Sequence, residues 1–253
     1  FLAGYRRINL TLSIPRFPKK VEFVSPTIMT TPDSQAEDSE EILESLASLY
    51  TAVVCDVLDT LGYRNQTLPA RIRPLTPKKD ICGRIFTARA RNITEIPAEP
   101  YKLEIAAVDA MTRGDLLLID AENNDTCGFW GELLTTACIY KGVRGVVMTA
   151  CTRDIWGLSE SGFPVFGIGY HPADSKGRAD IVAIGEPIEI DGVKAKTGDY
   201  LLGDEDGVVV IPCEVVMETI CKGEEKVSGE NVARADLANG VPMGEVFKKY
   251  GIL

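Results

Sequence analysis

Apolar positions recur at helical intervals where the compact part of the chain is predicted to begin. Residues 1–38 end in a polar, turn-forming tract, so we expect them to form an N-terminal arm. From Ser39 onward one apolar face repeats every three to four residues, at Ile42, Leu43, Leu46, Leu49 and Tyr50. A second short helix is predicted over residues 53–61, ended by Gly62.

Strands and helices alternate in the middle of the chain. Residues 83–90 alternate apolar and polar side chains, which is the spacing of a strand. The following pattern predicts a helix at 101–111, a strand at 115–120, a loop at 121–130, a helix at 131–141 and a strand at 143–149. Strands that alternate with helices of this length pair in parallel through right-handed crossovers. The sequence therefore predicts an α/β domain.

The rest of the chain is predicted to be β first and helical afterwards. Short apolar runs separated by Gly, Pro and Asp predict strands at 164–168, 181–184, 186–190 and 207–211. From Glu214 the spacing is helical, with a break at Gly240 and Pro242. We therefore expect the arm, an α/β domain over residues 39–212 and a helical tail over residues 213–253.

Composition and charge exclude several classes of protein. The chain has 253 residues, 45% of them apolar and 25% charged, as in an ordinary globular protein. Acidic residues outnumber basic ones 37 to 27 and no basic run occurs, so we expect no nucleic-acid partner. The apolar stretches near the start are too short to span a membrane, so we expect no membrane association.

Cysteine and histidine usage also restricts the chemistry. The seven cysteines are an odd number and form no Cys-x-x-Cys pair, so we interpret them as buried thiols of a cytoplasmic protein. Cys151 has no positioned histidine, which makes it a buried neighbour rather than a nucleophile. His171 is the only histidine, which excludes His-rich metal sites, and its position before Pro172 favours a structural or pocket-rim role over a catalytic one. The Asp199, Asp204 and Asp206 cluster lacks the spacing of a calcium loop and is interpreted as a turn.

Polar residues gather at two points that the predicted topology brings together. Gly131 and Glu132 open one helix, and Arg153 and Asp154 follow the next strand. The helix descends ~15 Å at ~1.5 Å per residue, and the strand climbs back ~20 Å at ~3.3 Å per residue. We therefore expect these residues at the carboxyl edge of the sheet, where open α/β sheets bind ligands.

These residue types would suit an anionic substrate and a metal ion. Amides in the first helical turn, at Gly131, Leu133 and Leu134, attract a carboxylate. Arg153 offers a planar fork for the same group, and Asp154 with Glu132 offers oxygen ligands that favour Mg²⁺ or Mn²⁺. A purely structural interpretation is also possible. Arg153 and Asp154 would then form a surface ion pair or turn, and Glu132 would only complement the dipole of its helix. The spacing alone therefore leaves function open.

Several segments resemble the RraA-like family, which includes the 4-hydroxy-4-methyl-2-oxoglutarate/4-carboxy-4-hydroxy-2-oxoadipate aldolases. Gly131-Glu132, twenty residues and then Arg153-Asp154 is similar to the acidic-x20-Arg-Asp motif of that family. Residues 55–62 (CDVLDTLG), 174–178 (DSKGR) and 198–212 (GDYLLGDEDGVVVIP) resemble further family segments. The match covers roughly residues 40–240. The chain differs from the shorter relatives by its N-terminal arm and by residues 120–125.

The resemblance implies a β/β/α swivelling fold, with trimers or hexamers and active sites between subunits. It implies that Asp154 binds a divalent metal directly, that Glu132 binds it through water, and that Arg153 holds the pyruvyl group. A glutamate from a neighbouring subunit is also implied, and Glu230 is the best candidate. The implied activity is a class II aldolase that cleaves a 4-hydroxy-2-oxo acid and releases pyruvate. Oxaloacetate decarboxylation passes through the same enolate and is the expected second activity.

The same resemblance admits two other functions. The family also contains non-catalytic regulators that bind a ribonuclease, and the complete set of Glu132, Arg153 and Asp154 argues against that role. Some members carry a methyltransferase label, but no Gly-x-Gly-x-x-Gly turn follows a strand in this sequence. Lyase activity is therefore the favoured prediction, and a partner-binding regulator is the alternative.

Overall fold

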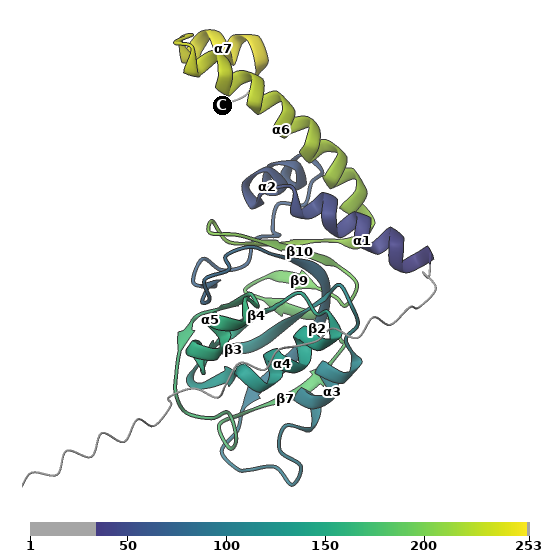
Figure 1. Cartoon of the computed structure of the whole chain (residues 1–253), viewed down its shortest axis with the longest axis vertical. Coiled ribbons are helices and arrows are strands. Elements are labelled where there is room, and N and C mark those ends of the chain that lie inside the picture. Colours follow the sequence, from purple (N-terminus) through teal and green to yellow (C-terminus); the bar gives the residue numbers. More distant parts are fainter. Residues whose placement is uncertain (1–33, 252–253) are drawn as a thin grey trace, which may run out of the picture. The chain divides into compact units, whose positions relative to one another are not determined.

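The computed structural model describes the backbone of residues 34–251 and the side chains of residues 40–251 (Figure 1). Residues 1–33 of the predicted arm lie outside the described residues, and helix α1 (Ser34–Ala47) begins ahead of the expected start at Ser39. Helix α2 (Thr51–Thr60) follows and ends just before Gly62. Gly62 has a φ of 90°, a conformation that glycine adopts without strain. Both predicted N-terminal helices are confirmed.

The described residues form a nine-stranded sheet and a separate two-stranded hairpin. The sheet contains β1 (Arg73–Pro74), β2 (Ile81–Asn92), β3 (Asp115–Trp130), β4 (Val146–Thr152), β5 (Val165–Gly167), β6 (Gly169–Tyr170), β7 (Ala179–Ile184), β10 (Tyr200–Gly203) and β11 (Val208–Ile211). The hairpin contains β8 (Ile188–Ile190) and β9 (Val193–Ala195). The four apolar runs predicted after Asp154 correspond to β5, β7, β8 and β11.

The centre of the sheet is parallel. β2, β3, β4 and β5 are successive neighbours that run in the same direction. Each crossover between them carries a helix: α3 (Lys102–Ala110), α4 (Glu132–Lys141) and α5 (Ile155–Ser161). Antiparallel strands flank this centre, since β7 and β10 pair with β2, β11 pairs with β10 and β1 pairs with β5. The short β6 pairs in parallel with β4. The predicted α/β class is confirmed, and the carboxyl ends of β3 and β4 meet at one edge.

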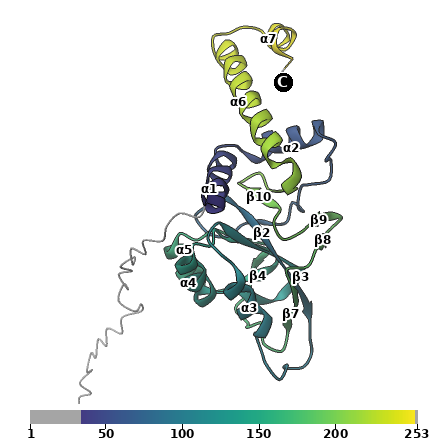
Figure 2. The same cartoon turned by 90° about the vertical axis from the view of Figure 1, so that its right-hand side faces the viewer.

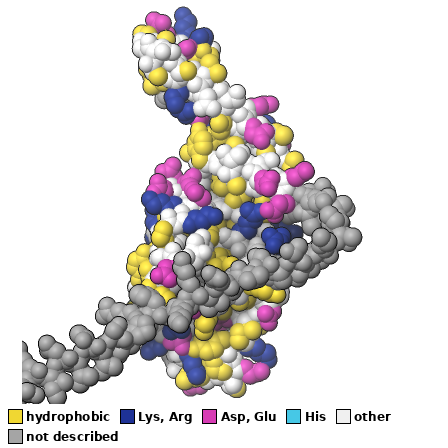
Figure 3. Space-filling model, viewed as in Figure 1, with side chains coloured by type: hydrophobic (Ala, Val, Ile, Leu, Met, Phe, Trp, Pro, Cys, Tyr) yellow, Lys and Arg dark blue, Asp and Glu magenta, His cyan; other side chains and the backbone are white. Residues whose placement is uncertain are grey.

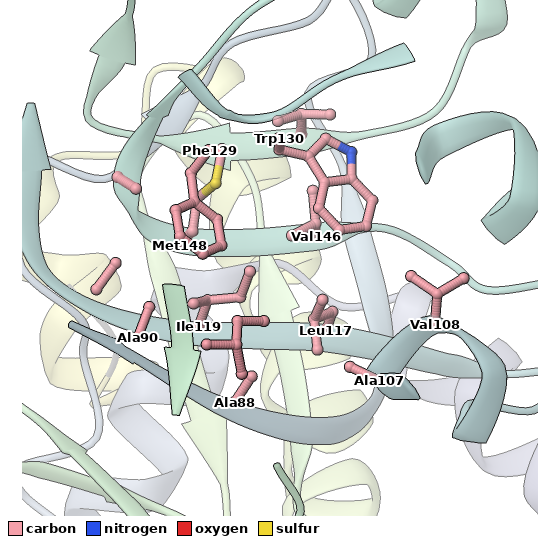
Figure 4. Close-up of a cluster of buried hydrophobic side chains, with 14 of the residues drawn as sticks. Ala88, Ala90, Ala107, Val108, Leu117, Ile119, Phe129, Trp130, Val146 and Met148 are labelled. Carbon is pink, nitrogen blue, oxygen red and sulfur yellow. The ribbon is translucent and has the colours of Figure 1, made fainter. Parts of the chain in front are cut away.

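Helices α3, α4 and α5 cover one face of this sheet (Figure 2). Leu117 and Ile119 of β3 and Met148 of β4 belong to the apolar cluster beneath them, together with Val108 of α3 (Figure 4). Trp130 closes the cluster at the end of β3, and its indole Nε1 donates a hydrogen bond to Thr135 Oγ1 at 2.8 Å. Burying each such side chain contributes about 1.5–3 kcal/mol to the stability of the fold. This packing therefore fixes the position at which β3 ends and α4 begins.

A second apolar cluster covers the opposite face of the central strands, and a third packs on the other side of β10. Leu116 and Leu118 alternate with the residues above and contact Leu201 of β10 and the β8–β9 hairpin. β10 in turn directs Leu202 toward α1, α2 and α6 (Val216–Ala238), which lie together over it (Figure 1). The period of two in β3 and β10 thus divides the core between the two faces.

The expected loop at residues 121–130 is wrong, because β3 continues through it to Trp130. The turn-forming residues do disturb the strand, since its register against β4 shifts three times between Ile119 and Trp130. Asn124 organises this irregular stretch: its side-chain oxygen accepts hydrogen bonds from the amides of Thr126 at 3.1 Å and Cys127 at 3.3 Å. Pairing with β4 therefore outweighs the local turn preference.

The tail is helical as predicted, with η1 (Cys213–Val215) leading into α6 and a break at residues 239–242 before α7 (Met243–Tyr250). The Asp204 carboxylate anchors the helical layer to the sheet, because it accepts hydrogen bonds from the Thr51 amide at 2.9 Å and hydroxyl at 2.7 Å. Within residues 34–251, no helix combines the length and the apolar character that crossing a membrane requires.

Charged side chains of both signs share the surface, and the cysteines differ in their exposure to solvent. On the face that the described residues present in Figure 3, acidic side chains lie interspersed with basic ones. The expectation of buried cysteines holds for Cys82, Cys127, Cys138 and Cys151. It is wrong for Cys213 and Cys221, which are exposed, and Cys55 is half-buried. The two exposed cysteines lie on η1 and α6, where the packing leaves their helix faces uncovered.

Candidate active site

The ends of β3 and β4 bring Glu132, Arg153 and Asp154 together, as their spacing predicts. The Arg153 amide donates a hydrogen bond to the Trp130 carbonyl at 2.9 Å, which ties the two strand ends to each other. Oδ2 of Asp154 then accepts a hydrogen bond from the Glu132 amide at 3.3 Å, at the start of α4. The carboxylate therefore lies at the positive end of a helix.

Two glycines make room for this contact. A Cβ atom on Gly131 would lie 2.6 Å from Oδ2 of Asp154, and one on Gly157 would lie 2.7 Å from Cγ of Glu132. Gly131 has an extended φ of -147°, so its requirement is space rather than backbone freedom. These close approaches explain why glycine stands before Glu132 and inside α5.

Asp154 adopts an unusual backbone conformation. Its φ of 58° and ψ of 37° place it in the left-handed region, at the N-cap of α5. Aspartate tolerates this conformation better than most residues, although it still costs free energy. The conformation turns the carboxylate back toward α4, and the side chain remains 41% exposed. Asp154 is thus placed to meet a ligand from the solvent side.

Asp174 orients the Arg153 guanidinium. Nη1 of Arg153 lies 3.2 Å from Oδ1 of Asp174, while Nε lies 3.8 Å from Oδ2 of Asp154. The Tyr101 hydroxyl donates a hydrogen bond to the other oxygen of Asp174. Burial and this hydrogen bond raise the pKa of Tyr101 to about 12, so the phenol stays a donor. Sequence reasoning noted Asp174 only as part of a family-like loop and missed this contact.

A cavity of about 230 Å³ opens beside these residues. Its lining includes the predicted Gly131, Leu133, Leu134, Arg153 and Asp154, and also Tyr101, Glu104, Ile105 and Asp174. Glu132 does not line it, and Oε1 of Glu132 accepts a hydrogen bond from Thr136 Oγ1 at 3.0 Å. A larger hollow of about 410 Å³ near Tyr50 and Arg144 contains none of the predicted site residues. The smaller cavity is therefore the candidate site.

Glu104 is the residue that sequence reasoning missed most clearly. It is 6% exposed and shares the buried face of α3 with Ala107 and Val108. Burial, followed by the charges of Asp174 and Asp180, raises its pKa to about 8, against the opposing effect of Arg153. The sequence did contain a signal for this burial. Glu104 precedes the apolar residues Ala107 and Val108 by three and four positions, so all three lie on the same face of the helix.

Glu230 lies away from the cavity within its own chain. It sits on α6, where it accepts a hydrogen bond from the Tyr50 hydroxyl and lies 3.6 Å from Nζ of Lys226 and 3.7 Å from Nη2 of Arg234. A contribution of Glu230 to the site of a neighbouring subunit stays a prediction.

Asp199, Cys213 and Glu214 form a separate group with potential metal-ligand atoms. Asp199 already accepts hydrogen bonds from the amides of Lys196 at 3.0 Å and Cys213 at 3.0 Å. Glu214 lies 3.4 Å from Nζ of Lys196. These contacts shape the turn between β9 and β10 and the entry to η1, which agrees with the predicted structural role of Asp199.

The fold and the site together define an RraA-like protein. The RraA-like family model, described as Aldolase/RraA, matches residues 51–210, so the chain belongs to this family. The crystal structure of Streptomyces coelicolor RraAS2, described as an unusual member of the RNase ES inhibitor RraA protein family, superposes with a TM-score of 0.69 at 25% identity. That match covers 77% of this chain and 97% of RraAS2.

Two curated proteins are also similar to this chain. "Putative 4-hydroxy-4-methyl-2-oxoglutarate aldolase" of Halalkalibacterium halodurans is 26% identical over 208 residues, covering 82% of this chain and 93% of that protein. Protein DlpA of Legionella pneumophila is 24% identical over 220 residues, covering 85% of this chain. The alignment spans only 35% of DlpA, about a third of its length. The family thus includes proteins named as aldolases and proteins named as ribonuclease inhibitors.

Proposed function

We propose that the protein is a divalent-metal-dependent lyase that cleaves the C3–C4 bond of a 4-hydroxy-2-oxo acid and releases pyruvate. The observation that carries this proposal is the meeting of Arg153 and Asp154 with the start of α4 beside one small cavity. A volume of about 230 Å³ is below the usual range of roughly 300–1,000 Å³ for drug-sized ligands, so it suits a small acid. The aldolase names of relatives support the same reaction class.

The side chains present fit a hard divalent ion. Asp154 offers a half-exposed carboxylate that accepts a hydrogen bond from the Glu132 backbone amide at 3.3 Å. The Glu132 carboxylate, at the same end of α4, accepts a hydrogen bond from Thr136 Oγ1 at 3.0 Å. Among the described residues that line the cavity, none is histidine or cysteine, so an all-oxygen set favours Mg²⁺ or Mn²⁺ over zinc. Asp154 would hold the ion directly and Glu132 through water. When bound, the ion would supply Lewis-acid stabilisation of the enolate.

The chain's own residues account for substrate binding and proton movement. The Arg153 fork binds the 2-oxo carboxylate. The amides of Leu133 and Leu134, in the first turn of α4 where Gly131 provides no side-chain cap, would bind the same anion. Glu132 accepts the proton of the C4 hydroxyl through a water molecule. The C3–C4 electron pair then becomes the pyruvate enolate as C4 leaves as a carbonyl, and protonation of C3 gives pyruvate. Oxaloacetate loses CO₂ through the same enolate.

Assembly into a trimer or hexamer belongs to the same proposal. Glu230 is remote from the cavity of its own chain, so it can act only at a neighbour's site. Glu230→Gln should lower pyruvate release while leaving the oligomer intact in light scattering, and Glu225→Gln on the same helix is the matched control. A fully active monomer of 27.5 kDa would contradict the shared site.

A non-catalytic regulator is the second candidate, because RraAS2 belongs to a family described by ribonuclease inhibition. A coupled assay for pyruvate over 4-hydroxy-2-oxo acids and oxaloacetate, with Mg²⁺ and with excess chelator, separates the two. We expect release that chelator abolishes and Mg²⁺ or Mn²⁺ restores. Calorimetry with Mn²⁺ on wild type and Asp154→Asn tests the ion site without relying on turnover. Full activity in chelator, or none under any condition, would contradict the lyase proposal.

A further inference from the structure

Helix α3 contributes an unpartnered acidic side chain to the wall of the cavity. Glu104 is 6% exposed, and its carboxyl has no hydrogen-bond or ion-pair partner among the described residues. Within residues 40–251, Thr219 Oγ1 is the only fully buried side-chain polar atom that lacks a hydrogen-bond partner. The unpartnered oxygens of Glu104 must therefore retain some accessible surface. The carboxyl therefore keeps its hydrogen-bonding capacity for whatever occupies the cavity.

The charges around the cavity are unequal. Arg153 is its only cationic lining residue within the described part of the chain, whereas Glu104, Asp154 and Asp174 are acidic. Arg153 is already 3.2 Å from Asp174, and the proposed reaction uses its remaining capacity for the 2-oxo carboxylate. A second carboxylate at the far end of a substrate would find no cation on the α3 wall.

The α3 wall is suited to an uncharged group instead. Ile105, next to Glu104, also lines the cavity and is 54% exposed, so it adds apolar surface. The pKa of Glu104, at about 8, keeps its carboxyl protonated at neutral pH. A neutral carboxyl both donates and accepts a hydrogen bond, and thus matches an alcohol.

We propose that Glu104 binds the substrate beyond C4 and selects 4-hydroxy-2-oxo acids that end in an alcohol over those that end in a second carboxylate. This inference rests on the proposed lyase function. Two acids of equal length isolate the difference. 4,5-Dihydroxy-2-oxopentanoate would give pyruvate and glycolaldehyde, and 4-hydroxy-2-oxoglutarate would give pyruvate and glyoxylate. They differ only in a hydroxymethyl group against a carboxylate.

The experiment measures kcat/KM for both acids by pyruvate release, with oxaloacetate as a third substrate, on the full chain with Mg²⁺. We expect wild type to prefer the dihydroxy acid by about tenfold or more. Glu104→Ala should reduce that preference by about tenfold. Glu104→Gln, which keeps size and neutrality, should retain it. Asp109→Asn, an exposed acid-to-amide change on the same helix, is the matched control and should leave both values unchanged.

A cation on the rim supplies a variant that does not disturb the buried position. Ile105→Lys places an amine at a half-exposed site beside Glu104, so it should raise kcat/KM for 4-hydroxy-2-oxoglutarate and not for the dihydroxy acid. This variant keeps the test decisive if Glu104→Ala fails to fold.

The outcomes distinguish a failure of the proposed role of Glu104 from a failure of the proposed lyase function. Pyruvate from oxaloacetate or the dicarboxylate, with no preference for the dihydroxy acid, overturns the role of Glu104 and leaves the lyase standing. The same holds if Glu104→Ala and Ile105→Lys both keep the wild-type ratio. No pyruvate from any of the three substrates overturns the lyase proposal and this inference with it.

Discussion

Replacing Glu104 by glutamine should remove a pH-dependent loss of stability. The pKa of Glu104 is about 8 in the folded protein against 4.5 for the free side chain, mainly because the side chain is buried. Between these values the folded state holds a proton that the unfolded chain has released. Unfolding free energy therefore falls as pH rises from about 4.5 to about 8. Below this window both states are protonated, and above it the full penalty applies.

The size of the penalty follows from the same values. Each tenfold change in proton affinity corresponds to about 1.4 kcal/mol, so the ceiling is roughly 5 kcal/mol. The carboxyl oxygens border a cavity and are not fully enclosed, which lowers the effective cost of ionisation. We therefore expect wild type to lose roughly 2–3 kcal/mol more than Glu104→Gln between pH 5 and pH 9.

Urea unfolding at pH 5, 7 and 9, at one protein concentration, measures this difference. Wild type and Glu104→Gln should diverge as pH rises, while Asp109→Asn, which changes an exposed acid on the same helix, should follow wild type. Equal m-values would show that the comparison concerns stability alone. Parallel curves for wild type and Glu104→Gln across this range would refute the reasoning, because Glu104 would then ionise alike in both states.

Four further substitutions test the site and its frame. Asp154→Asn should abolish Mn²⁺ binding in calorimetry and lower pyruvate release by roughly 100-fold or more, with thermal stability near wild type because the side chain is 41% exposed. Arg153→Lys should lower kcat/KM roughly 10–100-fold, since it keeps charge and loses the fork. Gly131→Ala should impair catalysis without changing circular dichroism, because its Cβ would lie 2.6 Å from the Asp154 carboxylate. Asp204→Ala should cost about 1–3 kcal/mol in urea unfolding through the lost bonds to Thr51.

The sequence predicted the architecture where local spacing and topology agree. The helix opening at Gly131 and the strand preceding Arg153 were expected to share one edge, and the Arg153 amide does bond to the Trp130 carbonyl there. The strand itself runs over Val146–Thr152 rather than 143–149, because spacing finds an apolar run more reliably than its ends. The prediction of a loop at 121–130 was wrong for another reason. Hydrogen bonding between β3 and β4 outweighed the turn preference of the residues in this segment.

Helix α5 and strands β1, β6, β9 and β10 were not predicted from the sequence. The sequence by itself determined the two N-terminal helices, the alternation of strands and helices over residues 83–149 and the residues at the carboxyl edge of the sheet. These features depend on the periodicity of apolar residues and on the connections between consecutive strands, and both can be recognised within short segments of the sequence. Only the tertiary structure decided that Asp174 aims Arg153 and that Glu104 is a neutral wall of the cavity. Asp174 and Glu104 are distant in sequence from Arg153. Their protonation and orientation depend on burial and on neighbouring charges, which exist only once the chain has folded.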